Sequence, residues 1–128
     1  MSSDAALLGR WGEKQAAGYL HQKGYRLLAA GYRCRMGEID LIAQKGRELA
    51  FVEVKLRRNA NFAEPREQVT AAKQRRILLA ARHFLAQHPE YGEHYCRFDV
   101  AELLGNLLER EQVRLREKGA AAEWEYPG

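Results

Sequence analysis

Residues 38–56 read EIDLIAQKGRELAFVEVKL and contain two segments typical of neighbouring β-strands. Residues 38–43 alternate in polarity, and residues 49–56 are rich in β-branched and aromatic side chains. Between them, Gly46 and Arg47 make a favourable two-residue hairpin turn. The stretch therefore predicts an antiparallel hairpin, which we expect at the centre of the fold.

The length of the turn decides which residues of the two strands face each other. With a two-residue turn, Asp40 is expected directly opposite Glu53, and Glu38 directly opposite Lys55. Directly opposed Cβ atoms lie about 4.5–5.5 Å apart, and two carboxylates that close repel each other unless a positive charge lies between them. A divalent cation with oxygen ligands at about 2.0–2.2 Å would fit there. The hairpin therefore predicts a metal site with Asp40 and Glu53 as ligands.

Lys55 completes the predicted catalytic group. Because side chains alternate along a strand, Glu53 and Lys55 share one face. A metal at this place would activate a water and stabilise charge on a phosphate, while the ammonium would orient the water or neutralise phosphate oxygens. The alternative is a solvated strand face on which Lys55 only forms a salt bridge with Glu38 or Glu53. The apolar character of residues 49–56 and the matched positions of the two acids favour the metal site.

Further helices and strands are expected on both sides of the hairpin. They are a helix over residues 4–23, a strand over 25–33, a helix over 65–87 and a strand over 95–101. Gly24 is a suitable residue to follow the end of the first helix. Pro65 is a favourable first residue for the second helix, and Pro89 ends it.

This order of elements predicts a mixed α/β sandwich with a small central sheet, and it argues against a doubly wound nucleotide-binding fold. The 128 residues are expected to form one domain, because no linker, repeat or low-complexity tract divides them. Residues 105–128 carry no clear pattern. A charged helix and a further strand around Trp124 remain alternatives for that segment.

Charge is unevenly distributed along the chain. Residues 1–88 hold 16 Lys and Arg against 8 Asp and Glu, whereas residues 89–128 hold 5 against 9. A basic field around an acidic site suits a polyanionic substrate, although a surplus of this size is also common among other proteins. No apolar run reaches the roughly 20 residues that cross a membrane, and no secretory signal precedes the domain. With only two cysteines, Cys34 and Cys96, expected as reduced thiols, the cytoplasm is the expected location.

Two segments of the hairpin together resemble a known family. Residues 37–42 read GEIDLI and residues 51–57 read FVEVKLR. They strongly resemble the YraN-like family of predicted endonucleases, which belongs to the restriction-endonuclease-like superfamily and is related to Holliday-junction resolvases. The resemblance spans roughly residues 9–100 and covers that superfamily's acidic–acidic–lysine signature. It implies the restriction-endonuclease-like fold, a mixed central sheet flanked by helices.

The resemblance also implies an activity and one more acidic residue. The activity is Mg²⁺- or Mn²⁺-dependent hydrolysis of DNA phosphodiester bonds, on branched or structured DNA. Glu13 matches a first-helix glutamate that joins the metal site in related resolvases, and it shares a helix face with Ala16 and Leu20. One departure from the superfamily pattern is Ile39, which stands where a proline usually precedes the first acid.

Several basic residues are expected to contact the DNA backbone without reading its sequence. They are Arg35, Arg57, Arg58, Lys73 and Arg76. A solvated basic face is the competing interpretation. For the whole protein, the alternative to an endonuclease is a non-catalytic nucleic-acid-binding or assembly protein that retains the nuclease fold. Because resolvase-like relatives act as dimers on two-fold symmetric substrates, a homodimer is one option, and the sequence leaves the oligomeric state open.

Overall fold

The computed structural model describes residues 4–57, 70–104 and 114–119. In chain order, the elements are α1 (Asp4–Gln22), β1 (Arg26–Cys34), β2 (Gly37–Lys45), β3 (Glu48–Arg57), α2 (Ala71–Gln87), a 3₁₀ turn (Pro89–Tyr91), β4 (Tyr95–Leu104) and β5 (Arg114–Gly119). The expected order of helix, three strands, helix and strand is therefore confirmed. Within the described residues, no helix is long and apolar enough to cross a membrane.

The five strands form one mixed sheet in the order β1-β2-β3-β4-β5. All neighbours are antiparallel except β3 and β4, which run parallel because α2 carries the chain back between them. The β2–β3 hairpin turns at Gly46, whose φ of +59° suits glycine, and Lys45 pairs with Glu48. The predicted hairpin and its turn are confirmed.

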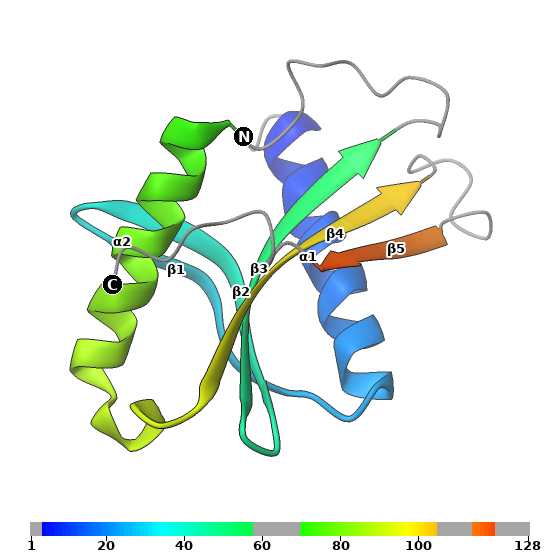
Figure 1. Cartoon of the computed structure of the whole chain (residues 1–128). Coiled ribbons are helices and arrows are strands. Elements are labelled where there is room, and N and C mark those ends of the chain that lie inside the picture. The colour runs from blue at the N-terminus through cyan, green and yellow to red at the C-terminus, as the bar shows by residue number, and fades with distance from the viewer. Residues whose placement is uncertain (1–3, 58–69, 105–113, 120–128) are drawn as a thin grey trace.

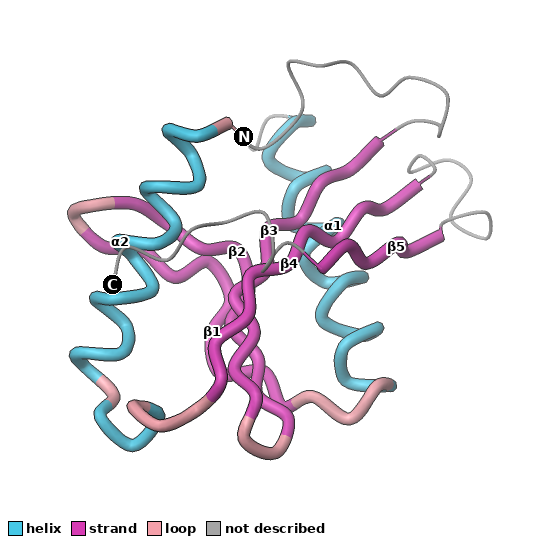
Figure 2. The backbone as a smooth tube through the Cα atoms, in the orientation of Figure 1, coloured by secondary structure: helices cyan, strands magenta, loops and turns pink. Residues whose placement is uncertain are grey.

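The two helices cover opposite faces of the sheet, with α2 on one side and α1 on the other (Figures 1 and 2). Ala16 and Leu20 of α1 belong to a buried cluster with Leu41 and Val52 of the sheet. The other face carries a separate cluster that includes residues of α2. The sheet is thus buried on both faces along its centre, which explains why β3 is apolar on both sides.

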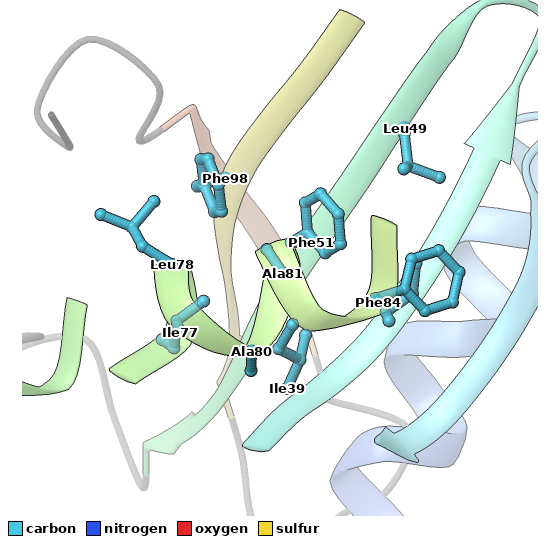
Figure 3. Packing of buried hydrophobic residues seen from close by; sticks show 10 residues of the cluster. Ile39, Leu49, Phe51, Ile77, Leu78, Ala80, Ala81, Phe84 and Phe98 are labelled. Atoms are coloured by element: carbon cyan, nitrogen blue, oxygen red, sulfur yellow. The ribbon is translucent and has the colours of Figure 1, made fainter. Parts of the chain in front are cut away.

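Aromatic and aliphatic side chains fill the layer between α2 and the sheet (Figure 3). Phe51 of β3 is fully buried and contacts two other rings, the stacked Phe98 of β4 and the edge-on Phe84 of α2. Ile77 and Ala81 of α2 lie in the same cluster. Burying each large side chain contributes about 1.5–3 kcal/mol, so this layer fixes α2 firmly against the sheet, chiefly over β2.

Two expected boundaries differ from the structure by three residues or more. Thr70 is extended, with φ −68° and ψ 162°, and its hydroxyl accepts from the amide N–H of Lys73, so α2 begins after Thr70 and not at Pro65. Pro65 itself lies outside the described residues, as does Trp124. β4 extends three residues beyond the expected end at residue 101, and its edge pairs with β5, a strand that was not expected at residues 114–119.

Replacing Gly37 with alanine is expected to lower the free energy of unfolding by about 1–3 kcal/mol. A Cβ atom at Gly37 would lie 2.7 Å from the carbonyl oxygen of Arg76, so either β2 or α2 would have to shift. Gly18→Ala is a matched control, because nothing lies within 4 Å of its Cβ position and alanine is favoured inside a helix. Thermal unfolding would compare the two. An unchanged midpoint for Gly37→Ala would contradict close contact between β2 and α2.

Candidate metal and nucleic-acid site

The strands β2 and β3 separate at one end of the hairpin (Figure 1). Their ladder runs from Lys45–Glu48 to Leu41–Val52 and stops there, although both strands continue. Just beyond the last pair, Oδ2 of Asp40 accepts a hydrogen bond of 2.7 Å from the backbone N–H of Val54. The side chain of Asp40 therefore bridges the two strands at the point where they part.

The predicted register holds inside the ladder and stops one pair short of the site. Asp40 and Glu53 are not a ladder pair, and neither are Glu38 and Lys55. Glu38 instead lies opposite Arg33 of β1 and forms an ion pair with it, with 3.2 Å between Arg33 Nε and Glu38 Oε2. The pKa of Asp40 nevertheless agrees with the expected convergence, because the charge of Glu53 and a side-chain hydrogen bond with Glu53 both raise it.

Burial and the negative charge of Glu53 raise the pKa of Asp40. Burial is the larger cause, and together the two effects raise the pKa of Asp40 from about 3.8 to about 7, although the N–H of Val54 acts in the opposite direction. Glu53 itself is only 6% exposed. Without a cation, Asp40 is therefore largely protonated just below neutral pH.

In the absence of divalent cations, the free energy of unfolding is expected to fall as the pH rises from about 4 to about 7. Across this range the folded protein keeps a proton on Asp40 that the unfolded chain releases, so rising pH favours unfolding. Asp40→Asn removes this titration and should be more stable than the wild type at pH 7 by about 1–3 kcal/mol, with the difference vanishing near pH 4. Urea unfolding in EDTA at pH 4 and at pH 7 measures this difference in stability. Parallel pH profiles would show that Asp40 is ionised throughout.

Lys73 places an ammonium group against the acidic pair. Its Nζ forms an ion pair with Oε1 of Glu53, whose side chain is 7% exposed, whereas the side chain of Lys73 is 45% exposed. Lys73 lies in the first turn of α2, which Thr70 caps. From the sequence, Lys73 is expected only at a DNA phosphate. Its contact with Glu53 depends on how α2 packs against the sheet, which residue spacing does not reveal.

Glu13 approaches the pair from α1. The pKa of Glu13 is raised by burial first, and then by the negative charges of Glu38 and Glu53, against the lowering effect of Arg33. An Oε1 atom of Glu13 lies 4.0 Å from the Cβ position of Gly31 in β1. Glu13 is therefore within electrostatic range of the pair, and its role as a ligand stays a prediction.

Lys55 lies two residues beyond Glu53 in β3, with a half-buried side chain. Phe51 contacts the α2 layer, whereas Val52 and Val54 belong to the α1 side, so alternation places Glu53 and Lys55 on the face that α2 covers. In the parallel ladder, Lys55 pairs with Glu102 of β4. The expected shared face of Glu53 and Lys55 agrees with this packing.

A cleft of roughly 930 Å³ borders Glu53, between the β1–β2 turn and the first turns of α2. Three of the expected DNA-contacting residues line it, namely Arg35, Lys73 and Arg76. Arg33 lines it too. The other two expected contacts are not placed there: only the backbone of Arg57 is described, at the end of β3, and Arg58 lies outside the described residues.

The donor set suits a hard divalent cation. Among the described residues, no three His, Cys, Asp or Glu side chains are close enough together to hold a metal ion. Mg²⁺ does not need such a cage, because it keeps several waters and is usually held by one or two carboxylates together with substrate phosphates. The pair of half-buried Asp40 and buried Glu53, with a proton on Asp40 that a cation can replace, fits this requirement.

Comparison with known proteins gives the chain a family. The model described as "Uncharacterised protein family UPF0102" matches residues 12–103. The chain belongs to UPF0102. It is 45% identical over 96 residues to a UPF0102 protein of Acinetobacter baumannii strain AYE, covering 75% of this chain and 72% of the relative. It is also 45% identical over 114 residues to one of Chlorobium limicola, covering 89% and 88%.

The region matched by the UPF0102 model contains the whole candidate site. It begins one residue before Glu13 and ends near the end of β4. Asp40, Glu53 and Lys73 lie inside it, whereas β5 lies outside. The family therefore spans the elements that bring the acidic pair and the basic cleft together.

Proposed function

We propose that the protein is a metal-dependent endonuclease that hydrolyses DNA phosphodiester bonds in branched or otherwise structured DNA. The observation that carries this proposal is the close pair of half-buried Asp40 and buried Glu53, in which Glu53 raises the pKa of Asp40, beside a cleft lined by basic side chains. Such a pair destabilises the metal-free protein, so binding alone gives no reason for it. A cation site next to a phosphate-binding cleft gives a reason for the pair.

Each residue has a distinct task in this proposal. Asp40 and Glu53 hold Mg²⁺ or Mn²⁺, which supplies Lewis acidity at the scissile phosphate and a more acidic water. Lys55 orients the attacking water or neutralises a phosphate oxygen. Glu13 adds negative charge to the cluster, and Arg35 and Arg76 hold the DNA backbone.

The arrangement also supports membership of the restriction-endonuclease-like superfamily. A mixed sheet lies between α1 and α2, and the acidic pair lies where β2 and β3 separate. Glu53 and Lys55 follow on the next strand of the hairpin, as the superfamily signature requires. The resemblance to Holliday-junction resolvases favours branched DNA over plain duplex as the substrate.

A cleavage screen tests the proposed function. Linear, flapped, gapped and four-way-junction DNA would be incubated with the protein in Mg²⁺, in Mn²⁺ and in EDTA. We expect metal-dependent cleavage of at least one branched substrate and none in EDTA. Absence of cleavage on every substrate in both metals would overturn the proposal.

A non-catalytic nucleic-acid-binding protein is the second candidate. The ion pair between Lys73 and Glu53 favours it, because the ammonium already compensates part of the buried negative charge. Under this alternative, DNA binding would persist in EDTA with unchanged affinity, and no metal would yield cleavage. The same screen, run beside a binding titration, separates the two candidates.

DNA affinity is expected to fall steeply with salt and to vary little with base sequence. The cleft presents Arg33, Arg35 and Arg76 to a backbone, and each phosphate neutralised releases counterions on binding. With about three such contacts, affinity should drop roughly 30- to 60-fold between 50 mM and 200 mM salt. Titrations on two unrelated sequences in Ca²⁺ would measure this. A flat salt response would contradict a phosphate-binding cleft.

A further inference from the structure

The ion pair between Lys73 and Glu53 joins the acidic pair to the basic cleft. Glu53 is nearly inaccessible to solvent, whereas Lys73 is about half exposed and also lines the cleft. One side chain therefore touches both parts of the site. We propose that the ammonium of Lys73 occupies the metal's place on Glu53 in the metal-free protein, and that metal binding transfers it to a DNA phosphate. This inference rests on the proposed function.

The ammonium of Lys73 and a metal ion would compete for the carboxylate of Glu53. The ammonium of Lys73 lies against Oε1 of Glu53, and the other carboxyl group at the site, that of Asp40, is hydrogen-bonded to Glu53. Mg²⁺ requires its oxygen ligands at about 2.0–2.1 Å in octahedral geometry, which leaves no room for an ammonium against the same face of the carboxylate. Two positive charges at one carboxylate would also repel each other. Metal binding to Glu53 therefore displaces Lys73.

The displaced ammonium has a place to go. Lys73 is in the first turn of α2, and its flexible four-carbon stem reaches either inward to Glu53 or outward into the cleft. In the outward position it joins Arg35 and Arg76, which line the same cleft. Metal binding would thus add one positive charge to the surface that faces the DNA backbone.

Transfer of Lys73 makes metal binding and DNA binding mutually favourable. A metal that releases Lys73 raises the affinity for DNA, and DNA that attracts Lys73 raises the affinity for metal by the same factor. The metal-free protein would accordingly hold DNA weakly. A permanent salt bridge predicts none of this, because Lys73 would stay on Glu53 whether or not metal is present.

Chemical labelling of the wild-type protein tests the transfer directly. The amine of Lys73 is tied to a buried carboxylate without metal and would be free in the cleft with metal. With Mg²⁺ and no DNA, acetylation of Lys73 followed by mass spectrometry should rise about fivefold or more, on the scale of typical coupling between sites. Lys45, at the far end of the hairpin, serves as an internal reference and should not change. Unchanged labelling of Lys73 while Mg²⁺ binds would overturn the inference alone.

Metal titration of two variants provides a second test. Lys73→Met removes the competing ammonium, so Mg²⁺ affinity measured by calorimetry should rise about fivefold or more. Arg76→Met removes the same charge one turn along α2, and its effect should be clearly smaller, because Arg76 does not contact Glu53 in the described structure. Equal increases in Mg²⁺ affinity for the two variants would show that Lys73 acts only through its net charge, which would overturn the inference. If Mg²⁺ does not bind the wild type at all, both the inference and the proposed function fail.

Discussion

Asp40→Asn is expected to abolish cleavage while leaving the fold intact. The change removes one negative charge from the metal pair at nearly constant shape, and an amide oxygen can still accept the hydrogen bond from the N–H of Val54. Mg²⁺ affinity should fall about tenfold or more, and cleavage by at least two to three orders of magnitude. Calorimetry and a nuclease assay on the same preparation measure the two effects, and the unfolding midpoint confirms the fold.

Glu38→Gln is the matched control for this variant. It removes one negative charge from the same strand. Glu38, however, is mostly exposed, and its carboxylate forms an ion pair with Arg33. Its Mg²⁺ affinity should change by about twofold or less, since exposed charges are strongly screened. If both variants lost metal binding equally, the acidic field as a whole would bind the cation. If neither lost cleavage, the pair of Asp40 and Glu53 would have only a structural role.

The hairpin was predictable because its determinants are local. Gly46 adopts a positive φ in a two-residue turn, and the turn sets the register as far as Leu41 and Val52. The separation of the strands beyond Leu41 was not predictable from the turn. It depends on the side chain of Asp40, which takes a hydrogen bond from the backbone of Val54 where the ladder stops. The turn therefore predicts that Asp40 and Glu53 converge, but it does not predict the hydrogen bond from Val54 to Asp40.

The start of α2 shows two local signals in competition. Pro65 is favourable in the first turn of a helix, and Thr70 is favourable as an N-cap five residues later. In the structure Thr70 is extended and caps α2, so the cap decides the boundary. Its position also decides where Lys73 lies, since an N-cap at Thr70 places Lys73 in the first turn, at the mouth of the cleft.

The strand β5 could not be inferred from its own residues. Residues 114–119 read RLREKG, which shows no apolar alternation and little β-propensity. Its strand conformation comes from pairing with the edge of β4, from Leu104–Arg114 to Asp99–Gly119. Pairing of this kind depends on a neighbour and not on a pattern, so the alternatives considered for residues 105–128 did not include it at this position.

The contacts that give the site its chemistry are long-range in the same way. Glu13 of α1 lies within electrostatic range of the acidic pair, and Lys73 of α2 forms an ion pair with Glu53, so the cluster draws on helices that cover opposite faces of the sheet. Sequence spacing indicated which residues belong to the site, whereas only the packing shows that Lys73 already neutralises Glu53.

Lys55→Ala is expected to leave metal binding intact and still to lower cleavage by about two or more orders of magnitude. Lys55 is not a metal ligand, so removing its positive charge should tighten Mg²⁺ binding slightly. Loss of a positioned ammonium removes the group that orients the attacking water or neutralises the phosphate, and this loss appears in the chemical step. Single-turnover cleavage, with Mg²⁺ calorimetry on the same sample, would separate the two effects.

Lys45→Ala and Lys55→Arg are the controls that assign the effect of Lys55→Ala to position and not to net charge. Lys45→Ala removes one ammonium from the same hairpin. Lys45 lies at the turn beside Glu48, at the opposite end of the ladder from Asp40. Its cleavage rate should stay within about twofold of wild type, because an exposed charge at that distance is screened. Lys55→Arg keeps the charge but not the compact ammonium, so it should recover only part of the lost rate. Full activity in Lys55→Ala would show that Lys55 has only a structural role in the sheet. The proposed catalytic group would then consist of Asp40 and Glu53.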